Sequence, residues 1–133
     1  MAARSPLHVV VVGGGVAGLE TVLALHDLAG DGVRLELVAP EAEVVVKALS
    51  TGAAFGVDHV RRHAVAAVVP QDVHTRQDRL LSVDPAGHTV TLENGETSYD
   101  ALVLAPGGRP RPAYPAAITF TPDWGERGLA GLL

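Results

Sequence analysis

The chain has 133 residues, of which 47% are hydrophobic, and it carries a formal net charge of −5 at pH 7. An acidic balance of this kind lacks the basic footprint of a nucleic-acid-binding protein. The chain contains no cysteine, which excludes disulfides, thiolate metal ligands and a dithiol redox pair. No apolar segment reaches the length of a transmembrane helix, and no signal peptide is recognisable, so we expect a cytoplasmic location. Length and composition indicate one α/β domain whose central strands are covered on both faces.

The first 39 residues follow the pattern of a β-α-β unit. An apolar run at Leu7–Val12 predicts a buried central strand. It passes into the spacing G-x-G-x-x-G at residues 13–18, and apolar residues from about Val16 to Ala29 recur at helical spacing. A second apolar strand is predicted at Val33–Ala39, after a Gly-Asp-Gly turn. A strand, a glycine-rich turn and a helix in this order are the context in which G-x-G-x-x-G indicates dinucleotide binding.

Each glycine of this motif answers a physical demand. Gly13 allows the chain to turn sharply off the strand, and Gly15 has no Cβ, so that a pyrophosphate can approach the backbone. Gly18 allows the helix to pack tightly on the strand. The free N–H groups near Val16 and Ala17 would then face the phosphates at the positive end of the helix dipole.

The segment between residues 40 and 72 gives weaker signals. Val44–Val46 fits either a short strand or a loop wall, and Ala64–Val69 predicts a short helix that a proline ends. His59 and His63 are four residues apart, the spacing at which two histidines on one helix face can ligate a metal. Basic neighbours and the lack of a third ligand at motif spacing favour a solvated basic turn, so we predict no metal site.

From residue 73 onwards the chain reads as β-structure. Asn94-Gly95 between two alternating segments is a strong hairpin signal, and the turn Asp84-Pro-Ala-Gly87 precedes it. The pattern predicts a three-stranded antiparallel β-meander inserted in a parallel sheet, which argues against a simple NAD-binding domain of a dehydrogenase, where helices continue to alternate with strands. The predicted strands are Val73–Arg76 and Ala101–Ala105 in the parallel sheet, and Arg79–Asp84, His88–Glu93 and Glu96–Tyr99 in the meander.

The glycine motif, the meander and the segment Tyr99-Asp-Ala-Leu-Val-Leu-Ala-Pro-Gly107 together resemble the N-terminal FAD-binding portion of the two-dinucleotide-binding-domain flavoproteins. This group contains the pyridine nucleotide-disulfide oxidoreductases, type II NADH dehydrogenases and sulfide:quinone reductases. The resemblance extends from Leu7 to about Phe120 and implies a Rossmann-like FAD/NAD(P)-binding α/β domain. It further implies that residues 1–121 form an FAD-binding domain, incomplete relative to the family, and that residues 122–133 begin a connection to a missing second domain.

The same resemblance implies where FAD would bind. The family's usual Ala-Thr-Gly motif reads Ala105-Pro106-Gly107 here, and proline supplies no N–H. Lys47 would lie near the pyrophosphate or the flavin, with a solvated surface charge as the alternative. The residues expected at the cofactor are Gly13, Gly14, Gly15, Val16, Ala17, Gly18, Ala39, Pro40, Glu41, Lys47, Leu80 through its backbone, Ala105, Pro106 and Gly107.

The end of the second strand departs from the family pattern. Proteins of this type place a carboxylate there, about 20 residues after the glycines, to hold the ribose hydroxyls. This chain has Ala39-Pro40-Glu41 at that point. Either Glu41 turns back to the ribose, or backbone or water holds the ribose and Glu41 is a solvated acid. No arginine follows this strand, which disfavours a 2′-phosphate, and hence NADP, at this site.

We therefore expect an FAD-binding domain of an FAD-dependent NAD(P)H oxidoreductase, in which the flavin carries electrons from a nicotinamide cofactor to a quinone or a similar acceptor. NAD(P)H would bind only through the missing second domain, and no side chain here is a candidate catalytic acid, base or nucleophile. The alternative is a stand-alone nucleotide-binding module or an inactive fragment without redox turnover, closed by self-association or by a partner. Apolar residues between Ile118 and Leu133 would suit that closure.

Overall fold

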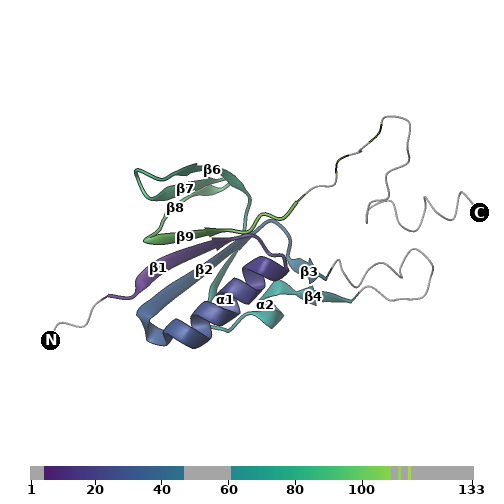
Figure 1. The fold of residues 1–133 in the computed structure, drawn as a ribbon, viewed down its shortest axis with the longest axis horizontal. Helices are drawn as coiled ribbons and strands as arrows, with labels where there is room; N and C mark the ends of the chain where they lie inside the picture. The colour runs from purple at the N-terminus through teal and green to yellow at the C-terminus, as the bar shows by residue number, and fades with distance from the viewer. Residues whose placement is uncertain (1–4, 47–60, 109–110, 112–113, 115–133) are drawn as a thin grey trace, which may run out of the picture. The chain divides into compact units, whose positions relative to one another are not determined.

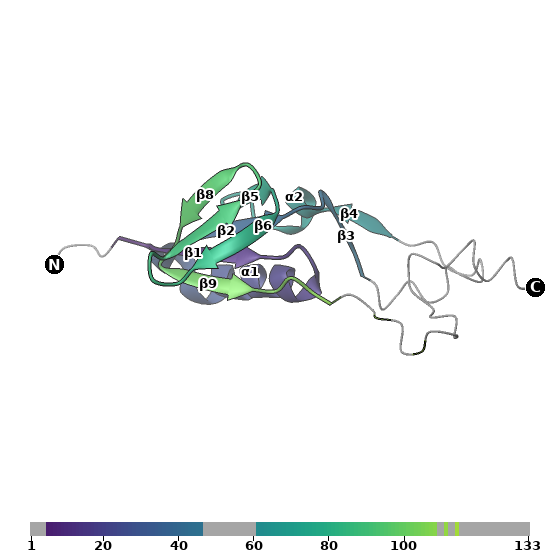
Figure 2. The same cartoon turned by 90° about the horizontal axis from the view of Figure 1, so that it is seen from above.

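A computed structural model describes residues 5–46, 61–108, 111 and 114 (Figures 1 and 2). Lys47, His59 and the apolar residues after Ile118 lie outside this part of the chain. The chain divides into two compact units, residues 1–44 with 63–107 and residues 45–62 with 108–133. The elements are β1 (Leu7–Val12), α1 (Val16–Ala29), the 3-10 turn η1 (Gly30–Gly32), β2 (Val33–Ala39), β3 (Glu43–Val45), β4 (Arg62–Ala64), α2 (Val65–Val68), β5 (His74–Gln77), β6 (Leu80–Asp84), β7 (Thr89–Leu92), β8 (Gly95–Ser98) and β9 (Ala101–Leu104).

Four strands form a parallel sheet in the order β5-β2-β1-β9. The predicted central position of β1 is confirmed, because β2 and β9 flank it and Val10 and Val11 are fully shielded from solvent. Val12, the last residue of β1, pairs with Val38 on one side and Leu104 on the other. The carboxyl ends of three strands therefore meet at one edge of the sheet, which is where ligands bind in open α/β sheets.

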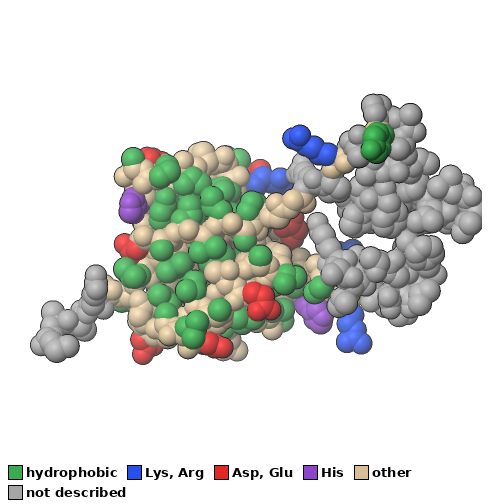
Figure 3. All heavy atoms as spheres, in the orientation of Figure 1, with side chains coloured by type: hydrophobic (Ala, Val, Ile, Leu, Met, Phe, Trp, Pro, Cys, Tyr) green, Lys and Arg blue, Asp and Glu red, His purple; other side chains and the backbone are tan. Residues whose placement is uncertain are grey.

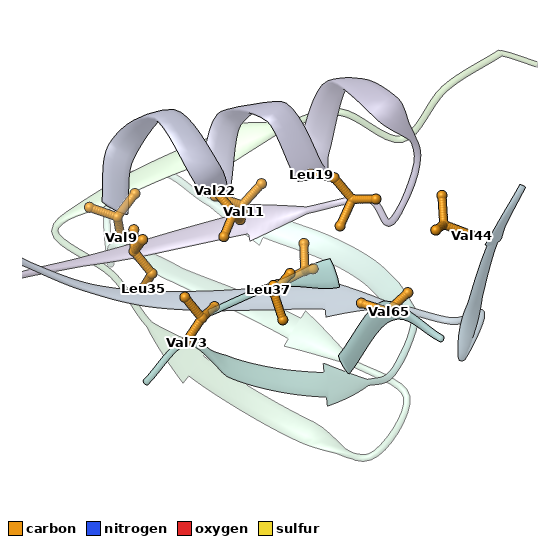
Figure 4. Close-up of a cluster of buried hydrophobic side chains, with 10 residues drawn as sticks. Val9, Val11, Leu19, Val22, Leu35, Leu37, Val44, Val65 and Val73 are labelled. Carbon is orange, nitrogen blue, oxygen red and sulfur yellow. The ribbon is translucent and has the colours of Figure 1, made fainter. Parts of the chain in front are cut away.

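Helix α1 covers one face of this sheet, as Figure 4 shows. It buries Gly18, Leu19 and Val22 against alternate residues of β1 and β2. Side chains of a strand point to opposite faces in turn, so only every second strand residue reaches this core. The core on this face comprises Val9, Val11, Leu19, Val22, Leu35, Leu37, Val44, Val65, Val69 and Val73.

The meander packs on the opposite face of the sheet. A second core joins the other strand residues, such as Val10 and Val38, to Val90 and Leu92 of β7. Burial on both faces explains why β1 and β2 are apolar at consecutive positions. Glu36, the one acidic residue of β2, is buried on this face. Its carboxylate accepts a hydrogen bond from Thr97 Oγ1 at 3.3 Å and forms a second one with His8 Nε2 at 3.0 Å.

The predicted three-stranded meander is confirmed, with its second turn shifted by one residue. β6 pairs with β7 and β7 with β8, all antiparallel. Leu92 pairs with Gly95, so the loop residues are Glu93 and Asn94 rather than Asn94 and Gly95. Gly95 is needed as the first residue of β8, where its φ is +127°. In β6 the register shifts at Leu81, which has no partner across the ladder and is 60% exposed.

The segment around His63 differs from its prediction. Residues Arg62–Ala64 form strand β4, paired with β3, rather than a solvated basic turn. All side chains of β4 are exposed, as in a turn. Backbone pairing alone makes this segment a strand, and such pairing produces no hydrophobic pattern in the sequence. β3 settles the alternatives for Val44–Val46 in favour of a strand, and the predicted short helix is present as α2. In the described part of the chain, no helix has the length and apolarity needed to cross a membrane.

Candidate cofactor-binding site

The turn that follows β1 is packed against the protein at its base. Gly13 has φ +122°, and a Cβ built on it would lie 2.0 Å from the backbone oxygen of Ala105. A Cβ on Gly18 would lie 1.8 Å from the backbone oxygen of Gly13. Real Cβ atoms essentially never come within 3.0 Å of another heavy atom. The fold itself therefore requires glycine at positions 13 and 18.

Hydrogen bonds hold this turn between the neighbouring strand ends. The Gly13 N–H donates to the Val38 carbonyl at 2.8 Å, and the Ala105 N–H donates to the Val12 carbonyl, also at 2.8 Å. Gly14 is close to the end of β2, since a Cβ on it would lie 2.8 Å from the Ala39 Cβ. The backbone at the base of the turn is thus fixed from both sides.

Gly15 is different, because the protein does not require a glycine there. Its φ of −78° suits any residue, and no atom of the described residues lies within 4 Å of a Cβ built on it. The residue is exposed. A side chain at this position would enter open space at the mouth of the turn, which is where a pyrophosphate approaches the backbone in dinucleotide-binding turns. The absence of a side chain at Gly15 fits a bound dinucleotide.

The start of α1 supplies positive electrostatic potential to the same place. Gly15 is the N-cap, no side chain caps the helix, and its first turn holds no acidic residue. The first helical hydrogen bond runs from the Leu19 N–H to the Gly15 carbonyl at 3.0 Å. The N–H groups of Val16, Ala17 and Gly18 therefore have no partner within the helix. Exposed N–H groups at a helix N-terminus bind anions such as phosphates.

The end of β2 presents no carboxylate to the site at position 39. Ala39 is 4% exposed and contributes only a methyl group. Its carbonyl accepts a hydrogen bond from the Asp78 N–H at 3.1 Å, and the Pro40 carbonyl accepts one from Gln77 Nε2 at 3.3 Å. Glu41 is exposed. The strand end is therefore bonded to the residues that follow β5, which the sequence alone did not indicate.

Asp78 fastens the meander to this edge of the sheet. Its buried carboxylate accepts hydrogen bonds from the Arg79 N–H at 2.8 Å, from Arg76 Nε at 3.1 Å and from both nitrogens of Asn94. Burial alone raises the pKa of the Asp78 carboxyl, but these hydrogen bonds together outweigh it, so the pKa lies below its ordinary value. Leu80, predicted to face the adenine through its backbone, starts β6 two residues later and packs partly into the second core.

The exit from β9 forms the other border of the site. Ala105 is half-buried, and its carbonyl lies against Gly13. Gly107 has φ +73° and, like Gly15, has no described atom within 4 Å of a built Cβ. Pro106 is exposed and supplies no N–H. This border is thus formed by small residues that leave the mouth of the turn open.

The described residues at this site present backbone N–H groups and open space to a ligand. Within the residues that the structure describes, no three His, Asp or Glu side chains are grouped so as to hold a metal ion. His63 is exposed in β4, and His8 is engaged with Glu36 on the meander side of the sheet. The exposed N–H groups at the start of α1 and the open space beside Gly15 can receive an anionic nucleotide.

Comparison with known proteins agrees with this geometry. Residues 7–124 match the protein family described as pyridine nucleotide-disulphide oxidoreductase. The sulfide:quinone oxidoreductase of Aquifex aeolicus is a similar solved structure, with 29% identity and a TM-score of 0.72 over 77% of this chain. Putidaredoxin reductase, in its covalent complex with putidaredoxin, has 29% identity and a TM-score of 0.67 over 86% of this chain. NDH2 of Plasmodium falciparum in complex with NADH, at 14% identity and a TM-score of 0.69 over 81%, shows the fold alone.

These structures are much longer than the chain. It covers 25% of the Aquifex aeolicus chain, 28% of the putidaredoxin reductase chain and 23% of the Plasmodium falciparum chain. It therefore spans about a quarter of the length of the structures that it matches.

Proposed function

Because the chain belongs to the pyridine nucleotide-disulphide oxidoreductase family, whose members are FAD-binding flavoproteins, we propose that it is the FAD-binding domain of an FAD-dependent oxidoreductase. In this proposal the turn after β1 receives the diphosphate of FAD. The observation that carries it is the empty space beside Gly15. At Gly13 and Gly18, by contrast, backbone atoms of the protein fill the space that a Cβ would take.

The N–H groups of Val16 and Ala17 would bind the diphosphate oxygens, supported by the uncapped positive end of α1. The two strand ends on either side would border the rest of the nucleotide. The further proposed contacts are Gly14, Ala39, Pro40, Glu41, Leu80, Ala105, Pro106 and Gly107, and Lys47 from outside the described residues.

FAD would supply two-electron redox chemistry when bound, and the residues around the turn would bind and orient it. We propose that the electrons pass from a nicotinamide cofactor to a quinone or a similar acceptor. The name of the Aquifex aeolicus enzyme supports a quinone. Residues 1–121 would be the FAD-binding domain and residues 122–133 the start of a connection to a second domain, through which NAD(P)H would bind.

Titration of the purified 133-residue chain with FAD tests the proposal. We expect the protein to take up FAD and to show a flavin absorbance band after removal of free cofactor. We expect no steady oxidation of NADH, because the nicotinamide site belongs to the second domain. A colourless protein whose melting temperature is unmoved by FAD, NAD and ADP would contradict the proposal, since a ligand that binds only the folded state raises that temperature.

The second candidate function is a nucleotide-binding module without redox turnover, closed by self-association or by a partner. The observation that favours it is the edge strand β9, which pairs on one side only, with β1, among the strands that the structure describes. Leu104 of β9 is 52% exposed and Leu81 of β6 is 60% exposed. Figure 3 shows hydrophobic side chains spread over the part of the surface formed by the meander and β9.

Light scattering separates the two candidates. A self-associating module has a molecular mass above that of one chain, and the mass falls on dilution. An FAD-binding domain that needs no such closure has the molecular mass of one chain and still retains FAD.

A further inference from the structure

The end of β2 leaves the ribose without its usual partner. If FAD binds as proposed above, on which this inference rests, its adenosine ribose lies beside the carboxyl end of β2. Position 39 gives it no polar side-chain atom, because the side chain of Ala39 is a methyl group, and the Ala39 carbonyl already accepts a hydrogen bond from the Asp78 N–H. Each ribose hydroxyl can donate and accept a hydrogen bond, so an amide as well as a carboxylate can pair with the two hydroxyls.

A polar side chain lies next to this position on the neighbouring strand. Gln77 is the register partner of Ala39 across the β2–β5 ladder. Arg76, one residue earlier, points toward the meander, where its Nη2 donates to the Asn94 carbonyl at 2.9 Å. Because strand side chains alternate between faces, Gln77 lies on the other face, together with Ala39.

The Gln77 amide is held across the end of β2. Its Nε2 donates to the Pro40 carbonyl at 3.3 Å, and the side chain remains exposed. In the described part of the chain this is its one hydrogen bond, so Oε1 and the second N–H of Nε2 are available to a ligand. An amide offers an acceptor and a donor at once, which complements a pair of hydroxyls.

We infer that Gln77 replaces the missing carboxylate and hydrogen-bonds the adenosine ribose of the bound nucleotide. Oε1 accepts from one ribose hydroxyl, and Nε2 donates to the other. Glu41 is the rival residue, since its carboxylate follows Pro40 and is exposed. The two assignments differ in whether the ribose hydroxyls form hydrogen bonds with Gln77 or with Glu41.

Comparing ADP with its 2′-deoxy and 3′-deoxy forms tests this assignment by isothermal titration calorimetry. We expect the wild-type chain to bind ADP about three- to tenfold more tightly than at least one deoxy form, the effect of one hydrogen bond. Gln77→Ala should bind ADP more weakly and lose this preference. Gln71→Ala, which changes an exposed glutamine in the turn before β5, should retain it.

The ratio of the affinity for ADP to the affinity for a deoxy form shows whether Gln77 contacts the ribose or only supports the protein around it. If Gln77 only supports Pro40, Gln77→Ala weakens binding of ADP and of the deoxy forms equally, and the inference is overturned. It is also overturned if Glu41→Gln abolishes the preference, or if the wild type binds all three ligands alike. Failure of the wild type to bind ADP or FAD at all contradicts the proposed function itself, a different outcome from an unchanged ratio.

Discussion

The glycine turn has a base, formed by Gly13 and Gly18, and a rim, formed by Gly15 at the mouth of the turn, and the two have glycine for opposite reasons. At the base, Gly13 and Gly18 are glycines because backbone atoms occupy the space that a Cβ would need. At the rim, Gly15 has an ordinary φ and open space around it, so nothing described in the protein demands glycine. The contrast teaches that the fold requires the glycines at the base, whereas the open space at Gly15 fits the proposed binding of a nucleotide.

The largest effect is expected at the base. Gly18→Ala should destabilise the protein by about 3 kcal/mol or more, because the new methyl group meets a carbonyl oxygen that hydrogen bonds hold in place. Helix propensity alone predicts the opposite sign, since alanine is favoured over glycine inside a helix by about 1 kcal/mol. Urea denaturation measures the difference.

Gly32→Ala serves as the matched control for that substitution. Gly32 ends the turn η1 and has no described atom within 4 Å of a built Cβ. It should change the free energy of unfolding by less than about 0.5 kcal/mol. Equal stability of the Gly18 and Gly32 variants would mean that the base is not packed as described.

The next largest effect is expected at the rim, and there it concerns binding. Gly15→Asp should weaken FAD binding at least about tenfold, because a carboxylate would occupy the open space and repel the diphosphate. The same change should raise the free energy of unfolding by a few tenths of a kcal/mol, since aspartate is a better N-cap than glycine. Flavin fluorescence gives the affinity, and urea denaturation gives the stability.

Gly15→Asn distinguishes charge from size in this experiment. Asparagine caps a helix as well as aspartate does but carries no charge. It should weaken FAD binding less than Gly15→Asp does. A Gly15→Asp protein that binds FAD as tightly as the wild type does would contradict the proposal that the diphosphate lies at Gly15.

A smaller effect is expected where Asp78 fastens the meander to the sheet. Its pKa is lowered in the folded state, so its contribution to stability is present above the unfolded value of about 3.9 and is lost as pH falls through the folded value. Asp78→Asn should therefore be less stable than the wild type at pH 7. The difference should shrink progressively below about pH 4.

Urea denaturation at several pH values between 7 and 3 measures this difference. Glu93→Gln is the control, because Glu93 forms an exposed ion pair with Arg79 at 3.4 Å and such pairs contribute little. A gap between wild type and Asp78→Asn that does not narrow in acid would contradict the role given to the Asp78 carboxylate.

The smallest effect is expected at Gly107, which shares features of both regions. Like the rim it is open, and like the base it has a backbone conformation, φ +73°, that favours glycine. Gly107→Ala should cost about 1 kcal/mol from that conformation alone. Gly107→Asn should cost less, because asparagine tolerates positive φ. Thermal unfolding that ranks the two variants the other way would contradict this explanation.

The sequence predicted what periodic burial and turn chemistry determine. β1, α1 and β2 have the predicted limits, because a helix and two buried strands impose strong patterns on their side chains. β4 has no such pattern, since its side chains are exposed and only backbone pairing with β3 defines it. The turn before β8 was displaced by one residue because Asn94-Gly95 specifies a positive φ at Gly95 without fixing which residues pair.

The site divides in the same way. The motif at residues 13–18 indicated a dinucleotide turn and predicted separate roles for its three glycines. The structure adds which atoms fill the space beside Gly13 and Gly18. The sequence analysis missed Gln77 and Asp78. They lie at the site because β5 pairs with β2, and the residues joined by this pairing are 37 or more positions apart in the chain. A polar residue at the carboxyl end of a predicted parallel strand was the one available signal.

The measurement that tests the central claim most directly is a titration of the ¹⁵N-labelled chain with ADP, followed by NMR of the backbone amides. Binding of the diphosphate at the rim predicts that the largest shifts occur at the amides of Gly15, Val16 and Ala17, with smaller ones at Ala39 and Gln77. Saturable shifts confined to other residues, with the amides at the start of α1 unmoved, would contradict the account.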